Sequence, residues 1–140
     1  MMKSKKHAKS AWVSNSSTTE KPWGSECRWA ALPTVAGKIL YIKEGHRNSL
    51  KYNNLKDECL FVLTGEVEVE FGNELSLTDP VANPFKKRVL EKGETLNVQS
   101  GCPYRITAHV DSSLIEIGSS GGAVEPETTI TRIEDDYGRE

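Results

Sequence analysis

A strict alternation of polar and apolar side chains over residues 66–71 is the feature that most constrains the fold of this chain. The segment reads Glu-Val-Glu-Val-Glu-Phe and follows the turn signal Thr64-Gly65. Successive side chains of a strand point to opposite faces, so the three apolar residues share one face and the three glutamates share the other. The segment is therefore predicted to be a strand with one buried and one solvated face.

Short segments of β character recur along the chain, separated by Gly, Pro, Asn and Asp. No stretch has a sustained 3.6-residue period, so helices are expected to be few and short. Short strands at regular spacing, with turn residues between them, predict an all-β sandwich or barrel. The other predicted strands lie near 37–43, 59–63, 87–91, 94–98, 104–109, 113–117 and 128–133.

The length of 140 residues corresponds to one ordinary domain. Residues 1–20 are polar and basic, with too little apolar surface to offset the entropy of ordering them. We therefore expect a mobile tail over 1–20 and a barrel over 21–140.

Composition excludes several classes of partner. A formal net charge of −2 argues against nucleic-acid binding, which requires a basic face. No apolar run approaches the roughly 18 residues of a membrane span. The three cysteines are odd in number and form no Cys-x-x-Cys pair, which argues against a disulfide scaffold or a zinc ribbon. We expect a cytoplasmic protein that binds neither nucleic acid nor membrane.

Two groups of residues have the spacing of a known barrel. In the first, Gly45 is followed by Lys51, Asn53, Glu58 and Gly65 at intervals of six, two, five and seven positions. This spacing is similar to the first motif of the cupin superfamily, which reads Gly, five residues, His-x-His, three or four residues, Glu, six residues, Gly. His-x-His places two ligands on one face of a strand.

The second group is similar to the second cupin motif, which reads Gly, five residues, Pro-x-Gly, two residues, His, three residues, Asn. Here Gly93 and Gly101 keep their places, Tyr104 stands in the His position and Ala108 in the Asn position. The resemblance implies a cupin-type double-stranded β-helix, or jelly-roll, barrel.

The two chain ends narrow the resemblance. Lys21-Pro22-Trp23-Gly24 and the segment 133–139 resemble the ends of type II mannose-6-phosphate isomerases, a cupin that also forms the C-terminal part of mannose-1-phosphate guanylyltransferases. Lys56 replaces an Arg of that family's first motif, and the matching residues there are Gly45, Arg47, Ser49, Leu50 and Glu58. The resemblance implies binding or isomerisation of a hexose phosphate or nucleotide sugar.

The departures from the family fall at its metal ligands. These positions correspond to Lys51, Asn53, Glu58 and Tyr104, and Glu58 alone keeps the family's residue type. One carboxylate does not hold zinc or iron tightly, and a lysine ammonium opposes a cation in the same cavity. No metal or other cofactor is therefore expected.

Two interpretations of the residues in the former metal site remain open. In the structural one, Lys51 and Glu58 face each other across one hairpin and form an ion pair that fills the site. In the catalytic one, Glu58 is the base of an aldose–ketose isomerisation, Lys51 stabilises the enediolate oxygen, and Tyr104 donates a proton or hydrogen bond.

Several further residues are candidates for substrate binding. The basic side chains suit a phosphate group. The candidates are Arg47, Asn53, Lys56, Arg105, Arg132 and Arg139.

Three classes of function stay open: a sugar-phosphate isomerase or binder, a metal-free binder of another small molecule, and a structural subunit. Exposed edge strands of barrels are often covered by a second subunit, so we expect a homodimer in which the segment around 21–40 is exchanged or packs across.

Overall fold

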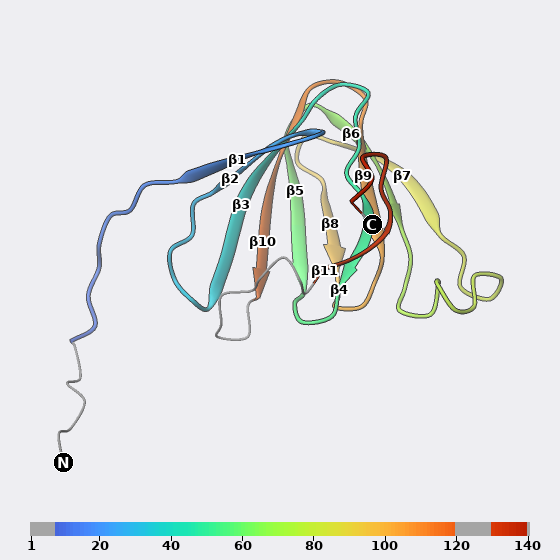
Figure 1. Ribbon diagram of the computed structural model, residues 1–140, viewed down its shortest axis with the longest axis horizontal. Coiled ribbons are helices and arrows are strands. Elements are labelled where there is room, and N and C mark those ends of the chain that lie inside the picture. The colour runs from blue at the N-terminus through green and yellow to red at the C-terminus, as the bar shows by residue number, and fades with distance from the viewer. Residues whose placement is uncertain (1–7, 120–129, 140) are drawn as a thin grey trace, which may run out of the picture.

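Eleven strands form two antiparallel sheets in the computed structural model, which describes residues 8–119 and 130–139 (Figure 1). The first sheet has six strands in the order β1 (Ser17–Lys21), β2 (Gly24–Arg28), β3 (Val35–Ile42), β10 (Ser112–Ser119), β5 (Glu58–Thr64) and β8 (Thr95–Val98). The second has five, in the order β11 (Ile130–Glu134), β4 (Leu50–Asn53), β9 (Tyr104–Ala108), β6 (Glu66–Phe71) and β7 (Lys86–Glu91).

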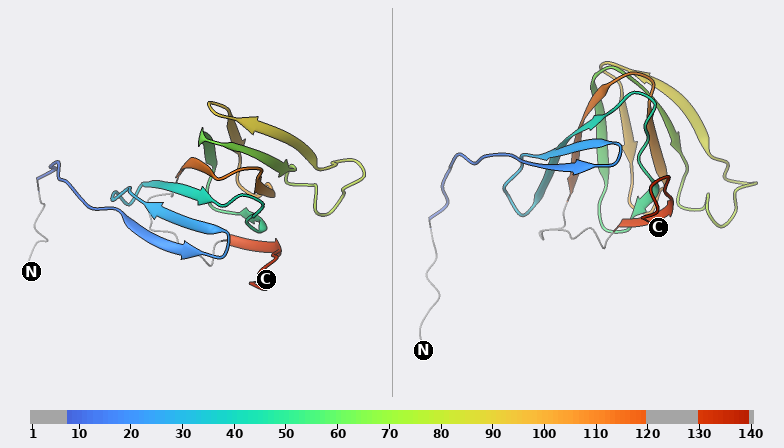
Figure 2. Two further views of the ribbon diagram at one scale, coloured as in Figure 1. Left: turned by 90° about the horizontal axis from the view of Figure 1, so that it is seen from above. Right: turned by 45° about the horizontal axis from the view of Figure 1, so that its top comes forward.

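The core lies between the inner faces of the two sheets, which curve toward each other (Figure 2). Val67 and Val69 of β6 are completely buried, while the glutamates between them are partly exposed. The prediction that residues 66–71 form a strand with one buried and one solvated face is therefore confirmed. Leu60 and Val62 of β5 and Leu114 of β10 meet them from the six-stranded sheet. The expectation of an all-β fold is confirmed, since the described residues contain no helix.

Three strands were not predicted from the sequence: β1, β2 and β4. The first begins at Ser17, inside the segment expected to be a tail, and pairs antiparallel with β2 from Ser17↔Arg28 to Lys21↔Gly24. The tight turn between β1 and β2 contains Trp23, whose side chain is only 4 % exposed and packs into the core. The backbone hydrogen bonds of the hairpin therefore order a segment whose composition is polar. Residues 8–16 form an exposed arm that runs away from the barrel (Figure 1).

The strand predicted near 128–133 corresponds to β11, although 128 and 129 lie outside the described residues. In the part of the chain that the structure describes, no helix is long and apolar enough to cross a membrane.

Candidate ligand-binding site

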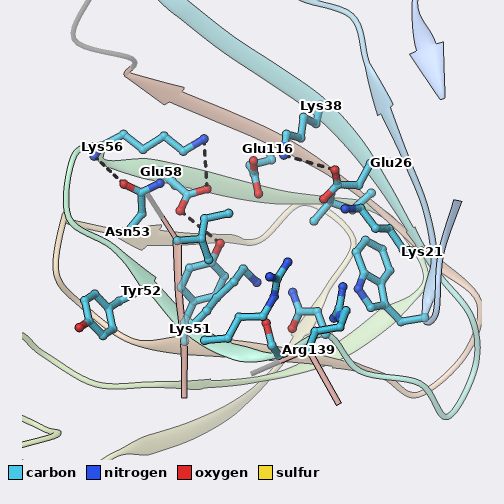
Figure 3. A pocket seen from close by; sticks show the side chains of 17 residues that line it. Lys21, Glu26, Lys38, Lys51, Tyr52, Asn53, Lys56, Glu58, Glu116 and Arg139 are labelled. Atoms are coloured by element: carbon cyan, nitrogen blue, oxygen red, sulfur yellow. Dashed lines mark hydrogen bonds and ion pairs between the residues drawn. The ribbon is translucent and has the colours of Figure 1, made fainter. Parts of the chain in front are cut away.

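A polar pocket opens between the two sheets (Figure 3). The cavity is small, with about 40 Å³ of space for the centres of water-sized molecules, and 17 side chains line it. The lining side chains come from β1, β2, β3, β10 and β5 and neighbouring turns on one side, and from β4, β9 and β11 and neighbouring loops on the other. The pocket therefore lies inside the barrel, where the two sheets face each other.

A row of charged side chains crosses the inner face of the six-stranded sheet. Lys38 of β3 stands directly opposite Glu116 of β10 in the strand register, and its Nζ lies 3.3 Å from an Oε atom of Glu26 on β2. Burial lowers the pKa of Lys38, but Glu116 and Glu26 outweigh that effect and leave this pKa raised. Glu58 of β5 ends the row. Strand alternation turns all four side chains inward, on the same face as the apolar core.

Glu58 lies on the floor of the pocket and is 7 % exposed. The Tyr104 hydroxyl donates a hydrogen bond to its Oε1 at 3.3 Å, and the Lys56 Nζ lies 4.0 Å from its Oε2. Burial, followed by repulsion from Glu116, raises the pKa of Glu58 to about 7 against the attraction of Lys56 and Lys51. A carboxyl with this pKa both accepts and releases a proton near neutral pH, as acid–base catalysis requires.

Lys51 approaches the same floor from the opposite sheet. It pairs with Tyr104 in the register of β4 and β9, and its Nζ lies 4.7 Å from the centre of the Tyr104 ring. Burial lowers the pKa of Lys51, and the nearby carboxylates of Glu58 and Glu116 oppose this shift. The cation–π contact and these carboxylates hold the buried ammonium in place.

The prediction that Lys51 and Glu58 face each other across one hairpin is wrong. β4 and β5 belong to different sheets, because residues 54–57 cross from one sheet to the other instead of closing a hairpin. Lys51 and Glu58 therefore face each other across the barrel, and the lysine that forms the ion pair with Glu58 is Lys56.

The predicted substrate-binding residues divide into two groups. Asn53, Lys56, Arg132 and Arg139 line the pocket with the three predicted catalytic residues, Lys51, Glu58 and Tyr104.

Arg47 and Arg105 do not line the pocket. Arg47 forms a two-pronged contact with Asp136 at the surface, with distances of 2.7 and 2.8 Å. Arg105 is buried, and it donates hydrogen bonds to the Asn48 carbonyl oxygen and to Glu134.

Hydrogen bonds and ion pairs within the protein hold two residues of the first group, Asn53 and Arg139, in addition to the Lys56 pair described above. The Asn53 Oδ1 accepts hydrogen bonds from the backbone N–H groups of Leu55 and Lys56, which fixes the start of the crossing loop. Arg139 pairs with Asp135 at 2.9 Å.

The sequence interpretation missed Glu26, Lys38 and Glu116, although a signal was present. Lys38 has the same strand parity as Leu40, and Glu116 has the same parity as Leu114. A charged residue in phase with buried apolar neighbours indicates a polar group facing the core. Reading this phase in both strands would have placed Lys38 and Glu116 inside the barrel.

The charge of the pocket differs from that of the whole chain. Its lining contains six basic and three acidic side chains, whereas the chain has a net charge of −2. The basic residues are Lys21, Lys38, Lys51, Lys56, Arg132 and Arg139, and the acidic ones are Glu26, Glu58 and Glu116. The excess of basic groups favours an anionic ligand.

The donor set does not fit a tightly bound transition metal. Lys51, Asn53, Glu58 and Tyr104 offer one carboxylate, and the Asn53 oxygen already accepts two backbone hydrogen bonds. Among the described residues, no three His, Cys, Asp or Glu side chains lie close enough together to hold a metal ion. The lysines beside Glu58 would repel a divalent cation.

Comparison with solved structures identifies the architecture. KdgF from Halomonas sp. superposes with a TM-score of 0.63 at 18% identity, over 80% of this chain and 89% of that one. Oxalate decarboxylase from Bacillus subtilis superposes with a TM-score of 0.72 at 14% identity, over 91% of this chain. This chain has a cupin fold.

The cupin barrel predicted from the motif spacing is thus confirmed, and the comparisons show no more than the fold. CapF with its inhibitor 3-isopropenyl-tropolone superposes with a TM-score of 0.65 at 14% identity, over 85% of this chain. This chain spans about a third of the length of CapF and of oxalate decarboxylase, 34% and 33%. No protein-family model and no curated protein matches the sequence. The narrower resemblance to mannose-6-phosphate isomerases stays a prediction.

Proposed function

We propose that this cupin binds a small anionic sugar of the hexose-phosphate class in the barrel pocket, and that Glu58 exchanges a proton with it. One observation carries the proposal: Glu58, Tyr104 and Lys51 converge from opposite sheets on the floor of one pocket. A proton-transfer group with a pKa of about 7 thus lies beside a hydroxyl donor and an ammonium group.

The charge of the side chains that line the pocket favours a ligand with a phosphate group. Six basic side chains against three acidic ones leave the pocket attractive to a dianion. Arg132 belongs to β11 and Arg139 lies beyond that strand, so two guanidinium groups line the side of the five-stranded sheet. Guanidinium groups bind phosphate oxygens through paired hydrogen bonds.

Aldose–ketose isomerisation is the reaction that this floor suits. The Glu58 carboxylate would take a proton from one carbon of the open-chain sugar and return it to the neighbouring carbon. The electron pair left on the first carbon forms an enediolate, whose oxygen the Lys51 ammonium and the Tyr104 hydroxyl would stabilise. The hydroxyl proton would pass from the oxygen of the first carbon to the oxygen of the second, which completes the exchange of carbonyl and hydroxyl groups. No step of this sequence passes through a metal ion.

Calorimetry with hexose phosphates tests the binding step. Chain dialysed against a chelator is titrated with mannose 6-phosphate and fructose 6-phosphate, and with mannose as the unphosphorylated control. We expect binding of the phosphates alone. Lys51→Met should weaken binding at least tenfold, because it removes the buried ammonium. Lys87→Met is the matched control, because Lys87 lies on β7, is 65% exposed and is absent from the pocket lining. Absence of binding by any hexose phosphate would contradict the proposal.

Proton exchange with solvent tests the chemistry separately. In D₂O, NMR should show deuterium entering at the carbon next to the carbonyl of the bound sugar. Glu58→Gln should abolish that exchange and leave the dissociation constant within a few-fold. Binding without exchange in the wild-type chain would assign a non-catalytic binder.

The second candidate is a metal-free cupin that binds without catalysis, and a specific observation favours it. Glu58 already has the Tyr104 hydroxyl and the Lys56 ammonium as partners, and Lys38 has Glu26. A network whose members satisfy one another is also what a purely structural polar core looks like. Exchange at the sugar carbon distinguishes the two.

A further inference from the structure

The outer face of the six-stranded sheet carries no charged side chain on five of its strands, β2, β3, β10, β5 and β8. Cross-strand register aligns Cys27, Ile39, Ile115, Phe61 and Thr95 in one continuous row across these strands. Alternation turns this row away from the core. Because 27% of the residues in the chain are charged, a broad face without charge requires an explanation.

The outer face of the other sheet provides the comparison within the same molecule. There Glu66, Glu68 and Glu70 of β6 point outward, and their register partners on β7 include Glu91 and Lys87. An antiparallel sheet with one face in water normally shows such a polar surface. The two outer faces therefore differ in the way that a solvated face differs from a covered one.

Several large side chains on the uncharged face are exposed in the single chain. Tyr41 is 45%, Ile117 48% and Phe61 37% exposed. Trp29 adds to them, because its ring lies over Gly37 of β3, where a Cβ atom would come within 2.6 Å of it. Aromatic residues and few charges are the composition found at the centre of protein interfaces.

We propose that this uncharged outer face of the six-stranded sheet is the interface with a second copy of the same chain. In a two-fold dimer the same patch meets itself, so a charged patch would bring like charges together. A face with no charge avoids that cost and needs no complementary partner. Two such sheets pack face to face at about 10 Å, as in a β-sandwich.

The exposed area of the uncharged face is compatible with an interface to a second copy of the chain. Six side chains of the face are each about two-fifths exposed: Trp29, Val35, Tyr41, Phe61, Leu63 and Ile117. At roughly 200 Å² for a large side chain they present roughly 500 Å² of surface. A stable interface buries about 800 Å² per partner, so this patch supplies most of it.

The N-terminal arm of residues 8–16 supplies further contact area. It leaves from β1 at the edge of the same sheet and carries Trp12 and Val13, which are 59% and 96% exposed (Figure 2). Nine extended residues reach about 30 Å, and six strands span roughly 24 Å. The arm of one copy is therefore long enough to cross the sheet of the other.

Sedimentation velocity over a concentration series tests the interface on the full chain. We expect a species of about 31 kDa, twice the 15.5 kDa of one chain, that dissociates on dilution. Ile117→Lys should halve the apparent mass, because it places a charge on each side of the interface. Val89→Lys should leave the mass unchanged, since Val89 is 42% exposed on the charged outer face of the other sheet.

A measurement on the unmodified chain keeps the proposal falsifiable if Ile117→Lys fails to fold. Cys59 is exposed on the proposed interface, and its alkylation should slow several-fold as the concentration rises. A wild-type chain that stays monomeric at every concentration would overturn the proposal. So would a folded Ile117→Lys variant that remains dimeric, or a Cys59 alkylation rate that does not depend on concentration.

Discussion

Glu58 is a buried carboxyl whose pKa is set by two opposing groups of effects. Burial and the Glu116 carboxylate favour its protonated form, while Lys56 and Lys51 favour its ionised form. The first two effects are larger, so its pKa is raised from 4.5 to about 7. Folding therefore increases the affinity of Glu58 for a proton, and the stability of the barrel depends on pH through this residue.

The sign of the pH dependence follows from the protons bound in each state. Between pH 4.5 and about 7 the folded chain holds the Glu58 proton and the unfolded chain releases it. The contribution of Glu58 to the free energy of unfolding is therefore fully present below this window, falls as pH rises through it, and is lost above it. The difference in pKa corresponds to a change on the order of 3 kcal/mol.

Glu58→Gln tests this dependence, because glutamine still accepts a hydrogen bond but does not titrate. We expect urea unfolding of the variant to show a shallower fall in stability across the window than the wild type shows. Glu91→Gln is the control, because Glu91 is an exposed glutamate on β7. Equal slopes for Glu58→Gln and the wild type would show that another group titrates.

At the scale of elements, two glycine turns bound the motifs that identified the barrel. Gly65 separates β5 from β6 with a φ of 88°, and Gly93 precedes β8 with a φ of 92°. Both angles lie in the left-handed region that a side chain disfavours. The surroundings differ: a Cβ on Gly65 would lie 2.2 Å from the Ser112 Oγ, whereas one on Gly93 would meet nothing within 4 Å.

Gly65→Ala and Gly93→Ala therefore separate backbone strain from close packing. Gly93→Ala should cost about 1 kcal/mol of stability, the strain of the left-handed angle alone. Gly65→Ala should cost at least about 2 kcal/mol, since it also disturbs the hydrogen bond from the Glu66 N–H to the Ser112 Oγ. Thermal or urea unfolding of both variants measures the difference, and equal losses would show that β10 moves aside without cost.

The molecule as a whole has two outer faces of opposite character around one polar interior. The glutamates of β6 put one outer face in water, while five of the six strands of the other sheet, including β3 and β10, have no charged side chain on their outer face. The pocket opens between the sheets, so ligand binding and pairing of two copies would use different surfaces. A dimer would therefore leave the Glu58 site on the inner faces of each barrel.

Strand alternation and motif spacing made much of the barrel predictable. Eight of the eleven strands among the described residues fall on predicted segments, which are marked by alternating or continuous apolar residues between turn residues. β1 was missed because polar residues such as Thr18 and Thr19 are held by backbone pairing with β2, which leaves no apolar pattern to read. β4 is a four-residue strand that contains the polar residues Lys51 and Asn53, and its polarity hid it in the same way.

The sequence by itself determined the alternation of the strands with a clear apolar pattern and the turn glycines, because these depend on local geometry. The spacing of the two motifs placed Lys51, Glu58 and Tyr104 at one site. Only the tertiary structure decided which groups meet. It paired Glu58 with Lys56, brought Glu116 from a strand far along the chain, and turned Arg105 away from the pocket. Alternation says which face a side chain takes, whereas its partner depends on the order of strands in each sheet and on how the two sheets close.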